Sequence, residues 1–263
     1  MKKGFILVLL LICMTVPIDT QEKLYLTVAV QEEMQSSNIF RATDEFSTRV
    51  LGWFYPPLYF HTGTTRELIP YVAEGMPVLL EEKKYAVHIR ETIQWDDGKP
   101  LTAFDVEFTV NLIKELELVS YSPDLETVKE CTASDTYTVV FVLNECTPKF
   151  WESVLTTLIV PRHQFLPLLE EARLTDDPAS IFLAMSVMDP VSAGPFSWGV
   201  SMNDFVRLPS NPTYFFKGHT FQDGARTVTV GPDYDGLLLR VYTEEDAVKA
   251  LLQGDVDYIW WQL

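Results

Sequence analysis

Apolar and polar residues alternate over several short segments of the chain, which is the pattern of strands with one buried face. Lys23–Val30 and Leu237–Tyr242 are the clearest of these, and other segments place apolar residues at helical spacing. The expected strands cover residues 23–30, 58–61, 85–90, 127–133, 137–145, 198–200, 204–209, 237–242 and 257–261, and the expected helices residues 38–54, 103–116, 150–160, 162–190 and 244–252. Helices and strands alternate irregularly, which indicates a mixed α/β or α+β fold.

The best-defined local feature is a helix that starts directly after a turn. Trp95–Pro100 has the Asp-Gly and Pro residues of a tight turn. Thr102 then stands at the N-cap position, and Asp105 has the position of the returning carboxylate of a capping box. Leu101 and Val106 flank this pair as a hydrophobic staple. We expect the cap to stabilise the fold by about 1 kcal/mol, which is a structural role rather than a chemical one.

The first residues have the composition of a targeting signal. Met1–Gly4 carries two lysines, and Phe5–Met14 is an unbroken apolar run. As a helix this run would rise about 15 Å, half of a bilayer core, so residues 1–20 are interpreted as a secretory signal peptide rather than a membrane span. Cys13 follows Leu10-Leu11-Ile12, a partial match to a lipoprotein cleavage box. We expect a secreted or periplasmic protein, or one on the outer face of the cytoplasmic membrane, and a lipid anchor at Cys13 is an open alternative.

The charge of the chain limits the kinds of partner that it can bind. There are 20 Lys and Arg against 37 Asp and Glu, a formal charge of −17. Removal of residues 1–20 takes away two lysines and Asp19, which leaves −18. Such a surface repels phosphate backbones and anionic lipids, so nucleic acid is excluded as a partner.

Three cysteines are too few for a disulfide scaffold and lack metal-type spacing. Outside the cytoplasm Cys131 and Cys146 would meet oxidising conditions. A hairpin that turns at Ser134-Asp135 places Cys131 opposite about residue 139, far from Cys146, so we expect no disulfide between them.

Sequence signatures of catalysis are missing. Ser197 lacks the preceding glycine of a nucleophile elbow, and the chain contains no G-x-G-x-x-G, Walker or H-E-x-x-H motif. No catalytic residue, metal ligand or cofactor is therefore predicted. The acid pairs Asp96/Asp97 and Glu244/Glu245 keep an extracellular hydrolase open as an alternative. The four histidines are scattered, at positions 61, 88, 163 and 219.

Six segments, taken in order, resemble the extracytoplasmic solute-binding proteins of the oligopeptide and dipeptide ABC importers (family 5). The longest is Trp95–Val110, W-D-D-G-K-P-L-T-A-F-D-V-E-F-T-V, with its tryptophan, its glycine and its capped helix. The others are Asp135–Leu143, Val160–His163, Gly194–Phe196, Asn211–Tyr214 and Glu245–Asp257.

The resemblance implies an α/β fold, namely the first lobe of a type II periplasmic-binding-protein (Venus-flytrap) fold. Residues 21–50 and 155–263 would build most of this lobe, and residues 51–154 would be an inserted subdomain. We expect the second lobe to be missing, because Leu263 falls near the point where the chain of family members crosses to it.

The same resemblance implies the ligand-binding positions. These are Gln31 and Glu32 after the first strand, Tyr55 after the first helix, and Trp260 and Trp261 near the hinge. An extended peptide can pair with exposed backbone there while flat aromatic rings contact its side chains.

The resemblance also implies the partners. They are an oligopeptide or a similar small solute, with oligosaccharide and metal chelate open, and ABC permease subunits energised by a separate ATPase. The full-length protein is expected to be a monomer. A truncated paralogue that acts as a decoy or interaction module is the alternative function.

Overall fold

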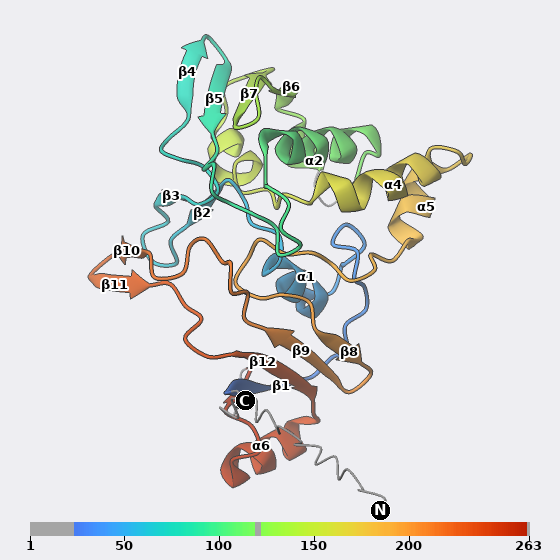
Figure 1. Ribbon diagram of the computed structural model, residues 1–263, viewed down its shortest axis with the longest axis vertical. Helices are drawn as coiled ribbons and strands as arrows, with labels where there is room; N and C mark the ends of the chain where they lie inside the picture. The colour runs from blue at the N-terminus through green and yellow to red at the C-terminus, as the bar shows by residue number, and fades with distance from the viewer. Residues whose placement is uncertain (1–23, 119–121, 262–263) are drawn as a thin grey trace, which may run out of the picture.

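The computed structural model describes residues 24–118 and 122–261, and its two larger sheets lie at opposite ends of the molecule (Figure 1). The first sheet has the strand order β13-β1-β12-β9-β8. Its strands are β1 (Tyr25–Val30), β8 (Val200–Met202), β9 (Phe205–Pro209), β12 (Gly236–Val241) and β13 (Tyr258–Ile259). The predicted signal peptide, residues 1–20 with Cys13, lies outside the described residues.

The first strand lies between two strands from the other end of the chain. β1 pairs in parallel with both β12 and β13, whereas β9 is antiparallel to β12 and to β8. The crossover from β12 to β13 contains α6 (Glu244–Gln253), which Thr243 caps and which ends at Gly254 with φ +80°. A left-handed backbone at this position favours glycine.

Side chains of β1 alternate between two cores, as the pleat of a strand requires. Ala29 packs with Ala247 and Ala250 of α6. Val28 and Val30 point to the other face of the sheet, where they belong to the main core with α1 (Glu45–Gly52). Figure 1 accordingly shows α1 and α6 on opposite sides of the first sheet.

The second sheet has the order β4-β5-β7-β6 and is covered by α2 (Ala103–Glu115). α4 (Arg162–Ala172) packs against α2, and α5 (Pro178–Ala184) packs against α4. The remaining elements of this half are β4 (Val78–Glu81), β5 (Lys84–His88), α3 (Ser122–Leu125), β6 (Val128–Ala133), β7 (Thr138–Leu143) and a π-helical turn, η1 (Phe150–Val154).

Two hairpins join the halves along one side of the molecule (Figure 1). They are β2 (Tyr59–His61) with β3 (Leu68–Pro70), and β10 (Thr220–Asp223) with β11 (Arg226–Thr229). The Asp223 carboxylate accepts hydrogen bonds from the Thr64 and Thr65 N–H groups at 2.9 and 3.1 Å, which fastens one hairpin to the other.

One hydrophobic core runs through both halves, from Val28 and Val50 to Val106 and Phe141. The helix α4, which the prediction assigns to the first lobe, packs on α2 across the expected boundary at residues 154 and 155. The division into residues 21–50 and 155–263 and an inserted subdomain 51–154 stays a prediction.

The predicted helices 103–116 and 244–252 match α2 and α6 to within one residue, whereas the other three predicted helices are longer than the observed ones. α1 starts only at Glu45, because the Asp44 carboxylate accepts the Ser47 N–H at 2.6 Å and caps the helix there. The expected helix 150–160 is wrong beyond the π-helical turn, since Leu158 forms a bridge with Pro57. The expected helix 162–190 divides into α4 and α5, and β3, β4, β10 and β11 lie in segments where no strand was expected.

The predicted hairpin of β6 and β7 is present, but Cys131 lies opposite Phe141 rather than residue 139. The connection takes residues 134–137 instead of a two-residue turn, which moves the register by two. Cys131 is buried, Cys146 is exposed, and both are free thiols.

Candidate ligand-binding site

The carboxyl ends of the parallel strands β1, β12 and β13 meet at one edge of the first sheet. In open α/β sheets this edge is where ligands bind. Gln31 and Glu32 follow β1, and Trp260 and Trp261 follow β13. The Trp260 N–H donates to the Ala29 carbonyl oxygen at 3.1 Å, which fixes the second pair beside the first.

These four residues line one cavity of about 420 Å³. Val30 and three residues of α1, Glu45, Phe46 and Arg49, complete its lining. Two segments about 230 residues apart in sequence thus share one site. A hydrogen bond of 2.8 Å from the Thr27 N–H to the Asp257 carboxylate joins the same two segments just before the cavity.

Trp260 and Trp261 point to opposite faces of the sheet. Trp260 lies on the α1 side, where its ring centroid is 6.0 Å from that of Phe46 and 5.3 Å from that of Trp53. Trp261 packs with the small core of α6. Its buried Nε1 has no hydrogen-bond partner in the described part of the chain, so it remains a free donor there.

Of the charged groups at the cavity, some have a protein partner and one does not. Arg49 forms an ion pair with Glu45 one helical turn earlier, and its guanidinium carbon lies 5.2 Å from the centroid of the Trp260 ring. Glu32 is exposed and makes no ion pair with any residue of 24–118 or 122–261.

A second cavity of about 350 Å³ continues from the first and shares Arg49 and Trp260 with it. Its walls are apolar and aromatic, and Phe196 stacks on Tyr234 at 6.3 Å with an interplanar angle of 21°. The remaining lining residues are Leu26, Val28, Trp53, Leu237 and Tyr258.

The expectation that Tyr55 faces the cleft is wrong for this structure. Its side chain is completely buried and packs edge-on against Phe165 at 5.9 Å. The Tyr55 N–H donates to the Leu51 carbonyl oxygen, which continues the turn of α1 and directs the ring into the core. Burial, and secondarily the charge of Asp96, raise the pKa of the Tyr55 hydroxyl.

Sequence reasoning missed the contribution of α1 to the site. Glu45 and Arg49 have the i,i+4 spacing of a helical ion pair, and that spacing was the available signal. Nothing local, however, indicates that Trp260 would lie against Arg49.

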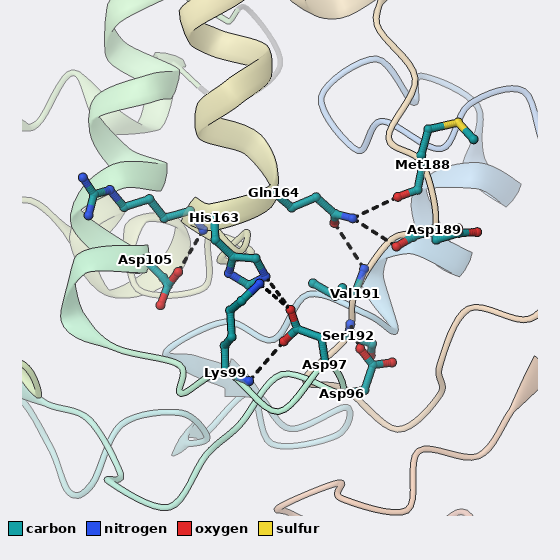
Figure 2. A network of polar contacts seen from close by, with 11 residues as sticks. Asp96, Asp97, Lys99, Asp105, His163, Gln164, Met188, Asp189, Val191 and Ser192 are labelled. Atoms are coloured by element: carbon teal, nitrogen blue, oxygen red, sulfur yellow. Dashed lines mark hydrogen bonds and ion pairs between the residues drawn. The ribbon is translucent and has the colours of Figure 1, made fainter.

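The most elaborate polar cluster lies elsewhere, between the Trp95–Pro100 turn and the start of α4 (Figure 2). Asp97 Oδ2 is 2.9 Å from Lys99 Nζ and 2.9 Å from His163 Nε2. Gln164 donates to the carbonyl oxygens of Met188 and Asp189 at 3.0 Å each and accepts the Val191 N–H. The cluster joins three segments that are distant in sequence.

Asp105 connects two helices in this cluster. Its Oδ2 accepts the Thr102 N–H at 2.8 Å, the predicted half of a capping box, and its Oδ1 accepts the Arg162 N–H at the start of α4, also at 2.8 Å. Burial raises the pKa of Asp105, and the hydrogen bonds from Arg162 and Thr102 oppose that rise.

The cluster also supports the aromatic wall of the second cavity. Asp96 and Ser192 exchange two hydrogen bonds, of 2.7 and 2.9 Å. The next residues, Ala193 and Gly194, donate their N–H groups to the carbonyl oxygen of Phe54. Phe54 directly follows Trp53 at the end of α1. Side chains in this cluster therefore act as a brace, which we call the Asp97 brace.

Three of the four acids considered for hydrolysis have structural partners. Asp96 and Asp97 belong to the brace, and Glu245 pairs with Lys249 within α6 at 2.7 Å. Among the described residues, no three His, Cys, Asp or Glu side chains are grouped as a metal site would require. In the same residues no helix is both long and apolar enough to cross a membrane.

The α/β fold is that of a lobe of the type II periplasmic binding proteins, as the sequence resemblance predicted. The chain belongs to the bacterial extracellular solute-binding proteins, family 5, whose middle region matches residues 67–262.

Named relatives are peptide-binding proteins. A putative ABC transporter peptide-binding protein of Brucella ovis is 23% identical over 226 residues, and the oligopeptide-binding protein AppA of Bacillus subtilis is 28% identical over 227 residues. The matches cover 85% and 84% of this chain but 38% of each relative. The chain thus spans about two fifths of the length of these proteins.

Solved structures agree on the fold. The mannohexaose-bound periplasmic oligopeptide-binding protein of Thermotoga maritima superposes with a TM-score of 0.70 at 22% identity, covering 92% of this chain and 42% of that one. AppA of Bacillus subtilis, in complex with a nonapeptide, gives a TM-score of 0.66 at 25% identity, covering 88% and 42%.

Proposed function

We propose that this chain is the first-lobe part of an extracytoplasmic solute-binding protein that captures oligopeptides or similar small solutes and delivers them to an ABC permease. The observation that carries the proposal is the convergence of Gln31, Glu32, Trp260 and Trp261 on one cavity at the carboxyl edge of the parallel strands.

The cavity has the groups that an extended peptide needs. β13 is an edge strand among the described residues, so its outer N–H and C=O groups are free to pair with an added strand. Gln31 provides both a donor and an acceptor, and the Trp260 ring provides a flat apolar surface.

Peptide is the favoured ligand class because the relatives are named for peptides. Mannohexaose bound to the Thermotoga protein keeps a sugar as the second choice, since aromatic rings stack on sugar faces as well. The permease, the ATPase, the extracytoplasmic location and a monomeric full-length state belong to the same proposal.

The test is a binding titration of the whole chain, with binding measured by calorimetry and by tryptophan fluorescence. The panel contains short peptides, mannohexaose and an iron chelate. We expect saturable binding of peptides, weakened by Trp260→Ala and unchanged by Tyr55→Phe, because Tyr55 lies outside the cavity. A chain that is folded by circular dichroism and binds no member of the panel would contradict the proposal and favour a decoy or interaction module.

A further inference from the structure

Three charged side chains line the cavity at the ends of β1 and β13, namely Glu32, Glu45 and Arg49. The Arg49 guanidinium is held by the Glu45 carboxylate and by the face of the Trp260 ring. Glu32 has no such partner among the described residues. The lining therefore carries one carboxylate whose charge is not balanced by the protein.

The surroundings of Glu32 strengthen an interaction with a ligand cation. Phe46 and Trp260 form apolar walls of the same cavity, and a charge pair gains strength as water is displaced from beside it. The formal charge of −17 on the chain attracts cations toward the surface. An anionic ligand group would instead meet a like charge.

The tryptophans fit the rest of a basic residue. Trp260 already accepts a guanidinium against its ring, at the distance of a cation–π contact. The Trp261 ring also lines the cavity, so the two rings offer an apolar surface to an alkyl stem. A cation on an alkyl stem is what a lysine or arginine side chain of a peptide provides.

We infer that the cavity selects peptides with a basic side chain and that Glu32 is the specificity-determining residue. This inference rests on the proposed function and adds the charge of the ligand to it.

The experiment compares three peptides of equal length, Ala-Lys-Ala, Ala-Gln-Ala and Ala-Glu-Ala, by calorimetry on the whole chain. We expect the lysine peptide to bind about fivefold more tightly than the glutamine peptide, the difference that a partly exposed ion pair provides. The glutamate peptide should bind most weakly. High salt should reduce the preference for lysine, since it screens exposed charges.

Two variants separate the local charge from the overall charge. Glu32→Gln should bring the ratio of lysine to glutamine affinity close to one. Glu33→Gln removes the same charge from the neighbouring exposed carboxylate, which does not line this cavity, and should leave the ratio as in the wild type. Glu45→Gln should lower the ratio as well, because it releases the charge of Arg49 into the cavity.

Equal affinity for the lysine and glutamine peptides would overturn the inference and leave the proposed function intact. An equal loss of preference in the Glu32 and Glu33 variants would overturn the role of Glu32. Failure of all three peptides to bind the folded chain would overturn both the inference and the proposed function.

Discussion

The Asp97 brace and the cavity at the ends of β1 and β13 contain the same kinds of side chain but use them differently. In the brace, Asp97, Lys99 and Gln164 all have protein partners within about hydrogen-bonding distance. In the cavity, Gln31 and Glu32 are exposed and make no side-chain hydrogen bond to the described residues. Polar groups that are already paired stabilise the fold, whereas unpaired groups remain available to a ligand.

The difference bears on how the longest motif is interpreted. Trp95–Val110 is the longest of the six segments that resemble the family, yet its carboxylates Asp96, Asp97 and Asp105 hold protein segments together. The residues that line the cavity belong to short, weakly patterned segments after strands. The length of a motif and its nearness to the cavity are thus separate properties in this protein.

The largest expected effect is that of Asp105→Ala. It removes the Asp105 half of the capping box of α2 and leaves the part-buried N–H of Arg162 without its acceptor, so we expect the free energy of unfolding to fall by about 3 kcal/mol. Urea denaturation measures this. Asp177→Ala is the control, because Asp177 caps α5 with one exposed hydrogen bond to Ser180, and its loss should cost about 1 kcal/mol. Equal losses would contradict a bridging role of Asp105.

Gly194→Ala should lower both the stability of the protein and its affinity for peptide. A Cβ at position 194 would lie 1.8 Å from the Trp53 carbonyl oxygen, so the end of α1 must move. We expect a loss of about 2 kcal/mol in the free energy of unfolding together with weaker peptide binding, since Trp53 lines the second cavity.

Gly52→Ala, in α1 itself, is the matched variant, because the nearest atom to its new Cβ would be 4.0 Å away. Alanine there should leave stability unchanged or raise it by up to about 1 kcal/mol. If the Gly194 variant is destabilised but binds peptide as the wild type does, the Asp97 brace does not support the binding site.

Asp97→Asn should destabilise the protein in a pH-dependent manner. Burial raises the pKa of Asp97, but hydrogen bonds from Lys99 and the charges of His163 and Lys99 outweigh it and hold the pKa below its ordinary value of 3.8. A lowered carboxyl pKa stabilises the fold above the unfolded-state value, and this contribution is lost as the pH falls through the folded-state value.

Wild type and Asp97→Asn should therefore differ by about 1 kcal/mol at neutral pH and converge as the pH falls below 3.8. Thermal unfolding across this range gives the comparison. Asp176→Asn, at an exposed position, should match the wild type at every pH. A constant difference for the Asp97 variant would show that its charge is not what matters.

The smallest effect on stability is expected for Gln31→Ala. The side chain is exposed, so the free energy of unfolding should change by less than about 0.5 kcal/mol. Peptide affinity should nevertheless fall several-fold, because the variant removes a donor and an acceptor from the cavity. A variant with wild-type affinity would remove Gln31 from the proposed site.

Much of the fold was predictable where the forces are local. Alternation identified β1 and β12, and the capping box fixed the start of α2 from residues only three positions apart. The exposed strand β4 was not predictable, because all four of its side chains are solvent-exposed and it lacks the expected alternation. The start of α1 only at Glu45 was not predictable from helical spacing alone, because the Asp44 carboxylate caps the helix there. The earlier residue Asn38 instead donates its amide to the Phe182 and Met185 carbonyl oxygens, which are distant in sequence.

Ligand binding by Gln31, Glu32, Trp260 and Trp261, which the resemblance implied and which line one cavity, stays a prediction. The sequence by itself determined the class of the fold and the capped helix. Short-range hydrogen bonds and side-chain periodicity suffice for these features, because they need no partner from a distant segment. Only the tertiary structure decided that Tyr55 is buried, that Arg49 lies against Trp260 and that Asp105 also binds the start of α4. These contacts join residues between about 50 and 210 positions apart in sequence. Local sequence patterns do not specify which of many distant residues will meet, because that depends on how the whole chain closes its long loops.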